Sequence, residues 1–474
     1  MSTTEVPKRV LVIGGGPCGL VALRNLVQRG KFDHVELWER RSEVGGVWHL
    51  DEADISKTKD LNGRFPSPAY KGLVGNVLPE FLGFSGFPFP TPSTSPHQPF
   101  PTLVDTQAYL LDFAEPYKKS GHIKLDREAI SVEEMTSDNQ NGAWKVVVKD
   151  WKNGGQTAVQ YWDAVVIAVG QYDNPVWPQI EGMDALKEAG LATHAKWYKG
   201  PEECEGKKIF VIGNANSSND IAAQTSPKAN GPVFQSIRRP NFPGFPSLTS
   251  ERIQIVAPVS KFVLKPSKSQ FDVILSDGTT LEDLDVVYCG TGYKPMTTFI
   301  SVLDPSKPLE PTLIPLGSDS VTPARIPSLH RIIMYAHNPT LGFVGAIYVY
   351  TPFIMADVAS TWLTLAWCNE CPYPPTPSGR LQFENDRLAL VKERRASMES
   401  PTSFLTYSVM GPDEQGYATG LREDIVEARP ELDKVLPVWN NETIQVRDGM
   451  FKTKYEALVY ARDRLSLSKP IAKS

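Results

Sequence analysis

The sequence predicts an α/β protein in which two similar strand–turn–helix folds occur, the second inserted within the first. An apolar strand, residues 9–13, runs into a glycine-rich turn at residues 14–19. A second strand, residues 208–212, runs into a comparable turn at residues 213–218. Two later apolar strands, residues 163–170 and 285–292, each end in glycine, where the chain can pass close to a ligand. These units are typical of Rossmann-like dinucleotide-binding domains.

The first turn carries the glycines that dinucleotide binding requires. Gly14 permits the turn off the strand, Gly16 lets the backbone approach a pyrophosphate, and Gly19 lets the helix pack close to the strand. The helix N-terminus then offers free N–H groups to phosphate. A second strand, residues 34–38, ends in Glu39, whose carboxylate would accept hydrogen bonds from ribose hydroxyls. We therefore expect one dinucleotide to bind at this turn.

The second turn is degraded, because Ala215 and Ser218 stand where glycines are usual. Its second strand, residues 233–237, is followed by two arginines where an acid would hold a ribose 2′-hydroxyl. Guanidinium groups suit a 2′-phosphate, so this site is predicted to bind NADPH rather than NADH. The alternative is that the arginines are a solvated pair on a loop. The predicted NADPH-binding residues are Asn216, Ser217, Ser218, Ser236, Arg238 and Arg239.

The echo between the two halves sets the expected domain boundaries. The 474 residues are enough for two or three domains. We expect residues 1–173 to begin the first domain and residues 174–285 to form the inserted one. Residues 286–474 would complete the first domain and add a C-terminal region. The long irregular stretch 48–101 is rich in aromatic residues, so we expect it to wrap the cofactor and form part of the active site.

Charge and composition exclude some classes of binding partner. The net charge is −5, and the chain has no run of lysines and arginines, which argues against nucleic-acid binding. The longest apolar stretch, residues 341–355, falls short of the ~20 residues of a membrane span and reads as a buried strand and helix start. No signal peptide is visible, so we expect a cytoplasmic protein without a membrane anchor. Its partner would be a small molecule, and a homodimer is possible.

The five cysteines include one closely spaced pair, Cys368 and Cys371. A zinc site would need a second such pair, and the chain has none, so no metal site is expected. A redox dithiol is an alternative. The pair follows an apolar helix-like segment, however, which favours two unpaired cysteines in the core.

Further motifs resemble those of the flavin-containing monooxygenases of the class B type, over roughly the chain up to Trp367. The family's Gly-Gly-x-Trp element corresponds to residues 45–48, and residues 70–79 resemble the segment that carries an active-site asparagine, here Asn76. The signature FxGxxxHxxxY matches residues 188–198 except at Glu188. Residues 289–293 are similar to the family's closing Ala-Thr-Gly-Tyr motif.

The resemblance implies FAD in the first fold and NADPH in the second. NADPH would reduce FAD, and the reduced flavin would react with O₂ at its C4a atom to give a hydroperoxide. The distal oxygen would pass to an amine nitrogen or a sulfur. Asn76 would be the catalytic residue, hydrogen-bonding NADP⁺ and the flavin adduct, although it could instead be a turn residue after Gly75. The implied FAD contacts are Gly14, Gly16, Gly19, Glu39, Arg40, Gly46, Val47, Trp48, Gln107 and Gly292.

Three alternatives stay open. Baeyer–Villiger monooxygenases, which act on ketones, share nearly every motif but carry tryptophan where this chain has Tyr198, which favours heteroatom oxygenation. A flavin disulfide reductase would need a dithiol beside the flavin. A non-enzymatic flavoprotein would bind FAD without turnover.

By the same resemblance, His194 is expected to be a linker residue rather than a general base. His49 is a further candidate neighbour of the flavin because of its position just after Trp48.

Overall fold

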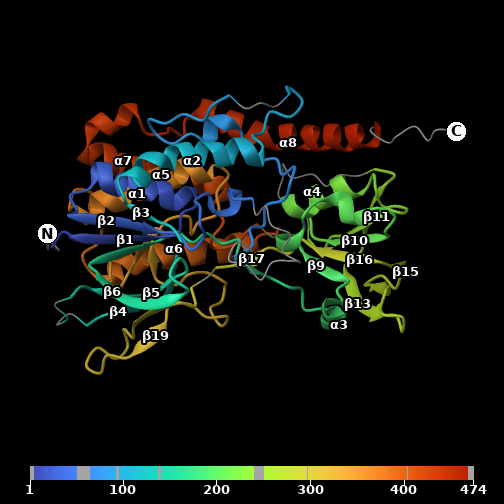
Figure 1. Ribbon diagram of the computed structural model, residues 1–474, viewed down its shortest axis with the longest axis horizontal. Coiled ribbons are helices and arrows are strands. Elements are labelled where there is room, and N and C mark those ends of the chain that lie inside the picture. The colour runs from blue at the N-terminus through green and yellow to red at the C-terminus, as the bar shows by residue number, and fades with distance from the viewer. Residues whose placement is uncertain are drawn as a thin grey trace.

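Two lobes make up the structure, a computed structural model that describes residues 5–50, 65–91, 95–136, 139, 141–239, 250–295, 297–402 and 404–467. Figure 1 shows the larger lobe built from both ends of the chain and the smaller lobe, green to yellow, built from its middle. The sequence analysis predicted this arrangement from two similar folds, one inserted in the other.

A seven-stranded sheet forms the centre of the larger lobe, which we call the first domain. Five neighbouring strands of this sheet are parallel, and the two at one end are antiparallel. The parallel strands are mostly apolar and buried, as expected for a sheet that is covered on both faces. Ile13 pairs with Trp38 across β1 and β2, so both strands end at the same edge. In spatial order the strands are β20 (Leu329–His330), β21 (Met334–Tyr335), β22 (Leu341–Phe343), β7 (Ala164–Ile167), β1 (Arg9–Ile13), β2 (His34–Trp38) and β3 (Ile123–Lys124).

Helices cover one face of this sheet. The helix α5 (Pro352–Trp367) is mostly apolar and is buried along nearly its whole length, because it lies between α1 (Pro17–Arg29) and α7 (Glu414–Ala428). Thr102 caps α2 and accepts a hydrogen bond from the Asp105 backbone. The helices of this domain are α1 (Pro17–Arg29), α2 (Leu103–Lys119), α5 (Pro352–Trp367), α6 (Pro377–Ala396), α7 (Glu414–Ala428) and α8 (Asn441–Leu467).

A second sheet of five strands covers the opposite face. One hairpin of this sheet turns at Gly154 and Gly155, and both glycines have positive φ angles. Trp144 and Trp162 pair across it and are fully buried against the central sheet. The strands in order are β19 (Leu313–Pro315), β18 (Ile300–Leu303), β4 (Arg127–Glu134), β5 (Trp144–Asp150) and β6 (Gln156–Trp162).

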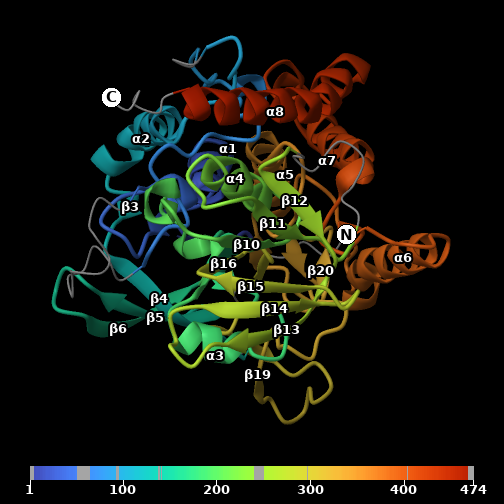
Figure 2. The ribbon, with the colours of Figure 1, turned by 90° about the vertical axis from the view of Figure 1, so that its right-hand side faces the viewer.

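The smaller lobe, or second domain, repeats the parallel architecture. Its sheet has the order β12 (Ile253–Val256), β11 (Val233–Ser236), β10 (Ile209–Ile212), β16 (Val286–Cys289) and β9 (Ala192–His194). Beside it lie α4 (Asn216–Thr225), α3 (Met183–Glu188) and a three-stranded antiparallel sheet. That sheet consists of β13 (Val259–Leu264), β14 (Phe271–Leu275) and β15 (Thr280–Leu284). Figure 2 views this domain end-on, with α4 on one side of its parallel sheet.

Two chain crossings join the domains, and they lie side by side. The outgoing strand β8 (Asn174–Pro175) pairs with the returning strand β17 (Tyr293–Lys294). The strand β16 pairs with β10 in the second domain, so the return follows Cys289 rather than residue 285. Residues 286–289 therefore belong to the inserted sheet, because their register with β10 continues the second fold.

Short 3₁₀ helices fill several connections. Those in the stretch between β2 and α2 are η1 (Gly46–Trp48) and η3 (Pro79–Phe81). The others are η4 (Ala195–Trp197), η5 (Pro201–Cys204), η6 (Gly411–Asp413) and η7 (Pro430–Lys434). Among the described residues, no helix combines the length and apolar character needed to cross a membrane.

Candidate active site

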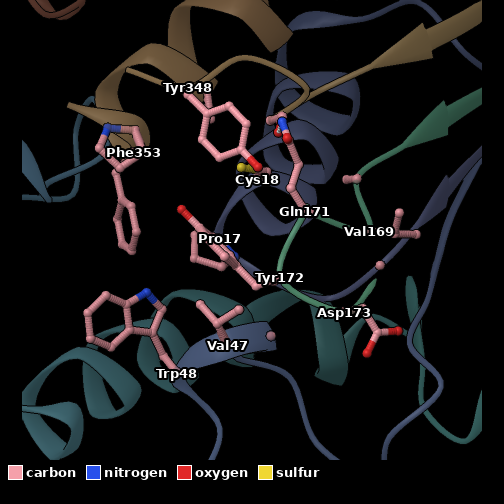
Figure 3. Close-up of a pocket in the computed structure, with 18 of the residues that line it drawn as sticks. Pro17, Cys18, Val47, Trp48, Val169, Gln171, Tyr172, Asp173, Tyr348 and Phe353 are labelled. Carbon is pink, nitrogen blue, oxygen red and sulfur yellow. Dashed lines mark hydrogen bonds between the residues drawn. The ribbon is translucent and has the colours of Figure 1, made fainter. Parts of the chain in front are cut away.

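A cavity of about 640 Å³ lies at the edge where β1 and β7 end. Figure 3 shows residues from separate segments around it, including Pro17 and Cys18 of α1, Trp48 of η1, and Tyr348 and Phe353 near the start of α5. A second cavity of about 160 Å³ adjoins it on the side of α4. Both cavities are lined by Val47, Trp48, Asn76, Tyr172 and Asn216.

The glycine turn has the geometry that its sequence predicts. Gly14 has φ +109°, and its N–H donates to the Trp38 carbonyl at 2.8 Å. A Cβ at Gly19 would lie 1.8 Å from the Gly14 oxygen, so only glycine lets the helix pack this closely. A Cβ at Gly16 would meet nothing nearer than Gly46 at 3.5 Å, so the backbones of both residues face the cavity. The turn thus leaves room for a pyrophosphate.

Glu39 is buried beside this turn. Its carboxylate accepts hydrogen bonds from the backbone N–H of Gly15 at 2.6 Å and of Arg41 at 2.9 Å. The side chain is only 4% exposed, yet it lines the larger cavity. A carboxylate oxygen accepts more than one hydrogen bond, so Glu39 can also receive ribose hydroxyls. Together with the glycine turn, this acceptor fits the adenosine end of FAD.

Arg40, also predicted to contact FAD, lines the cavity and forms an ion pair with Asp173 at 2.9 Å. Lys196 contacts the same carboxylate at 2.7 Å from the linker that follows β9. Burial alone would raise the pKa of Asp173, but the two cations and their hydrogen bonds bring this pKa below its usual range. Asp173 stays ionised and ties the first domain to the start of the second.

Asn76 lies in the wall common to the two cavities. Its Oδ1 atom is buried and accepts no hydrogen bond from the described part of the chain. The neighbouring Gly75 is fixed by a hydrogen bond from its N–H to the Pro101 carbonyl at 2.9 Å. Leaving a buried polar atom without a partner is costly, so a bound group or water that donates to this Oδ1 would be stabilising. The amide therefore fits a bound cofactor.

Gln171 is a site residue that the sequence analysis missed. It follows β7, is 5% exposed and lines the larger cavity. Its Nε2 donates to the Gly345 carbonyl at 3.3 Å, while its buried Oε1 has no partner among the described residues. No motif marks this position. The signal that would have found it is its place after a parallel strand, where ligands of such sheets bind.

Three predicted FAD contacts line neither cavity: Gly19, Gln107 and Gly292. Gln107 lies on α2, and its Nε2 is 3.4 Å from His49 Nδ1. Gly292 lies at the returning crossing, where its carbonyl accepts from the Val176 N–H at 2.9 Å. All three assignments remain predictions.

The predicted NADPH residues divide into two groups. Asn216 and Ser217 begin α4 and line the smaller cavity. Ser218 and Ser236 are buried, and their hydroxyls are hydrogen-bonded to the carbonyls of Gly290 and Ala257. The hydroxyl of Ser218 thus occupies space that a glycine at this position would leave empty, and it does not face a phosphate site. Beyond β11, the predicted pair Arg238 and Arg239 is exposed and lines neither cavity.

His194 has a structural environment. It is fully buried on β9, its Nδ1 accepts from the Lys196 N–H at 3.1 Å, and its ring packs edge-on against Tyr293. Burial lowers the pKa of His194 to about 4, so the ring is neutral near pH 7. It lines neither cavity, which supports the expected linker role.

The cysteines form no disulfide, and Cys368 and Cys371 are buried in the turn after α5, as predicted. Of the five, only Cys18 lines the larger cavity. Burial raises its pKa to about 12, so it is not a thiolate. Among the described residues, no cluster of histidine, cysteine and acidic side chains could hold a metal ion.

Comparison with known proteins finds a matching family and several relatives. The flavin-binding monooxygenase-like family matches residues 7–242. A thiol-specific monooxygenase of Saccharomyces cerevisiae is 28% identical over 379 residues, which cover 79% of this chain and 80% of that protein.

Two solved structures share the fold. The S-allyl-L-cysteine S-oxygenase of Allium sativum aligns with a TM-score of 0.72 at 20% identity, covering 98% of this chain and all of that one. Cyclohexanone monooxygenase aligns with a TM-score of 0.57 at 13% identity, covering 91% and 98%. These likenesses confirm the predicted α/β fold with two dinucleotide-binding domains. The predicted flavin cofactor is also supported by the family description, and the chain belongs to the flavin-binding monooxygenase-like family.

Proposed function

We propose that this protein uses NADPH and O₂ to transfer one oxygen atom to a sulfur or an amine nitrogen of a small molecule. The observation that carries this proposal is the Asn76 amide, which stands in the wall between the two cavities with its buried Oδ1 unpartnered in the described chain. An amide both donates and accepts, so Asn76 can contact a nicotinamide cofactor on one side and the flavin on the other.

FAD, when bound, would supply the redox chemistry, namely the use of NADPH as reductant and the transfer of one oxygen atom of O₂ to the substrate while the other leaves as water. The protein's part is to hold and shield. The glycine turn and Glu39 anchor the adenosine end, while the start of α4 offers N–H groups to the second dinucleotide. Trp48 and Phe353 contribute apolar wall, which excludes the water that would divert the reaction.

Sulfur is the first acceptor to test. One relative is named a thiol-specific monooxygenase, and a solved protein of the same fold is named an S-oxygenase. The larger cavity lacks the dithiol that a disulfide reductase needs, because Cys18 is the one cysteine in its described wall and burial raises the pKa of that thiol.

Baeyer–Villiger enzymes carry tryptophan where this chain has Tyr198. This tyrosine is 2% exposed and donates a hydrogen bond from its hydroxyl to Gln224 at 3.0 Å.

The test is turnover of the FAD-loaded protein with NADPH and ¹⁸O₂ in the presence of a dialkyl sulfide, a tertiary amine or a cyclic ketone. We expect a sulfoxide or an N-oxide that carries one labelled oxygen, with NADPH consumed in equal amount. An ester formed from the ketone would establish Baeyer–Villiger chemistry instead. NADPH oxidation recovered entirely as hydrogen peroxide with every acceptor would refute the proposal.

A further inference from the structure

One face of α8 lies against the candidate active site. Met450 and Phe451 precede Lys454 by four and three residues, so each of them lies next to Lys454 on the helix surface. Met450 and Phe451 line the larger cavity. Figure 1 shows α8 running from the first domain towards α4 of the second, and the two helices pack together. This helix lies outside residues 7–242, the part of the chain that matches the family.

The contacts of α8 bracket the segment that carries Asn76. Lys454 Nζ donates to the Gly75 carbonyl at 3.2 Å, immediately before Asn76. The Leu78 N–H donates to Met450 Sδ at 3.3 Å, two residues after it. Asn76 therefore stands between two points at which its own backbone is fastened to α8.

Lys454 also reaches the second domain. Its Nζ is 3.7 Å from Asp220 Oδ1 on α4, and the side chains are 8% and 9% exposed. Asp220 lines the smaller cavity and lies one turn beyond Asn216, which begins α4. Burial raises the pKa of Asp220, and the Lys454 charge opposes this effect. The buried ammonium group of Lys454 thus contacts α4 of the second domain and the segment around Asn76 of the first domain.

We propose that Lys454 is a positioning residue that sets the Asn76 segment relative to the NADPH-binding helix α4. Lys454 lines neither cavity and acts through the Gly75 carbonyl and Asp220. Binding of NADP⁺ beside α4 and ordering of Asn76 are then coupled, because the same ammonium group restrains both. The inference rests on the proposed function for the meaning of Asn76, but the geometry of the bridge does not.

Three variants separate positioning from simple loss of stability. Lys454→Met keeps the length and apolar stem but removes the charge, which leaves the Asp220 carboxylate buried without its partner. In the double variant Lys454→Met/Asp220→Asn no buried charge is left over, while the bond to Gly75 is still lost. Lys454→Arg keeps a charged donor and is the rescue variant. Lys452→Met is the matched control, because Lys452 is on the same helix with its side chain 84% exposed.

Three measurements on the FAD-loaded protein are informative. Amide hydrogen exchange of peptides spanning residues 73–79, with and without NADP⁺, reports on the Asn76 segment. Calorimetry gives the dissociation constant of NADP⁺. Turnover gives the ratio of hydrogen peroxide to oxygenated product. In both Lys454→Met variants we expect faster exchange in this segment, less protection on adding NADP⁺, and a several-fold rise in the dissociation constant and in the peroxide ratio. Lys454→Arg should recover part of each effect, and Lys452→Met should behave as the wild type.

Wild-type exchange and NADP⁺ affinity in the folded double variant would overturn the inference. So would equal changes in Lys452→Met. Failure of the proposed function looks different: the wild-type protein would then make no oxygenated product at all. The exchange and calorimetric results would still decide whether Lys454 links the two segments.

Discussion

At the scale of single residues, Gly16 decides whether the first dinucleotide can bind. A side chain at this position would point into the cavity, because a Cβ there meets only Gly46 at 3.5 Å. We therefore expect Gly16→Val to fold but to lose FAD, since valine would occupy the space of the pyrophosphate. Flavin absorbance of the purified protein, with circular dichroism for the fold, measures this. Gly420→Ala, on α7 with open space around it, should stay yellow. Full flavin content in Gly16→Val would contradict the assignment.

Arg238 tests the choice of nicotinamide cofactor. Its exposed position just beyond β11 is free of the packing constraints that hold Ser236. Charge-assisted hydrogen bonds to a 2′-phosphate contribute about 1.5–3 kcal/mol. Arg238→Ala should therefore raise the KM for NADPH roughly tenfold or more, since about 1.4 kcal/mol corresponds to a factor of ten, while the KM for NADH changes little. Lys207→Ala, an exposed cation of the same domain, is the control. Equal effects on both cofactors would show that Arg238 does not contact the phosphate.

Asn76 should affect coupling rather than reduction. Hydride transfer needs only binding and alignment, so flavin reduction should persist in Asn76→Ala and Asn76→Asp. Without an amide that shields and hydrogen-bonds the oxygenating site, O₂ should leave as hydrogen peroxide. Asn76→Asp is the sharper probe, because an ionised carboxylate keeps the size but cannot donate. The measurement is the ratio of peroxide to product. An unchanged ratio in both variants would make Asn76 a turn residue.

The sequence located part of the site because its residues belong to local motifs. Gly16, Glu39 and Trp48 line the larger cavity, as does Asn76. Gln171 was missed because no motif marks it, and the only signal is its place just after a strand of the parallel sheet. The hydroxyl of Ser218, a residue predicted to bind NADPH, is hydrogen-bonded to the Gly290 carbonyl and occupies space that a glycine would leave empty, a packing detail that the local motif does not specify.

At the scale of elements, a buried carboxylate fastens α1 to α5. Asp357 accepts from Arg24 Nη2 at 2.8 Å and from the Ser85 N–H at 2.6 Å, and its side chain is fully buried. Asp357→Leu leaves Arg24 buried and unpaired, so we expect the free energy of unfolding to fall by about 3–5 kcal/mol. Urea unfolding of the FAD-loaded protein measures this. Asp184→Asn, at an ion pair on the surface of α3, should cost less than about 1 kcal/mol. A similar small loss for Asp357→Leu would show that the pair is not needed.

The elements themselves were largely predictable, whereas their partners were not. The apolar stretch 341–355 was expected to form a buried strand and a helix start, and β22 and α5 occupy those places. The pairing of Asp357 with Arg24 joins residues 333 positions apart, so it depends on packing that short-range patterns do not encode. The part of the chain beyond Trp367 carries few motifs, yet α8 brings Met450 to the cavity wall.

At the scale of the whole molecule, Lys196 holds the domains in one relative orientation through Asp173, which also pairs with Arg40. Lys196→Met should leave the FAD content unchanged but slow flavin reduction by NADPH, because hydride transfer depends on alignment of the two cofactors. Anaerobic stopped-flow reduction measures the rate. Lys187→Met, which removes an exposed cation from the same domain, is the comparison, and its flavin should be reduced at the wild-type rate. A wild-type rate in Lys196→Met would mean that other contacts fix the orientation.

The pairing of β8 with β17 has a consequence for how such a protein can be assembled and altered. Opposed residues of an antiparallel pair lie about 4.5–5.5 Å apart between their Cα atoms, so the inserted domain leaves and rejoins its host almost at one point. Its two ends are as close as those of a surface loop. The second domain can therefore be exchanged between relatives by joining the chains at these two strands. Such an exchange would replace the second dinucleotide-binding fold and leave the central sheet of the first domain uncut.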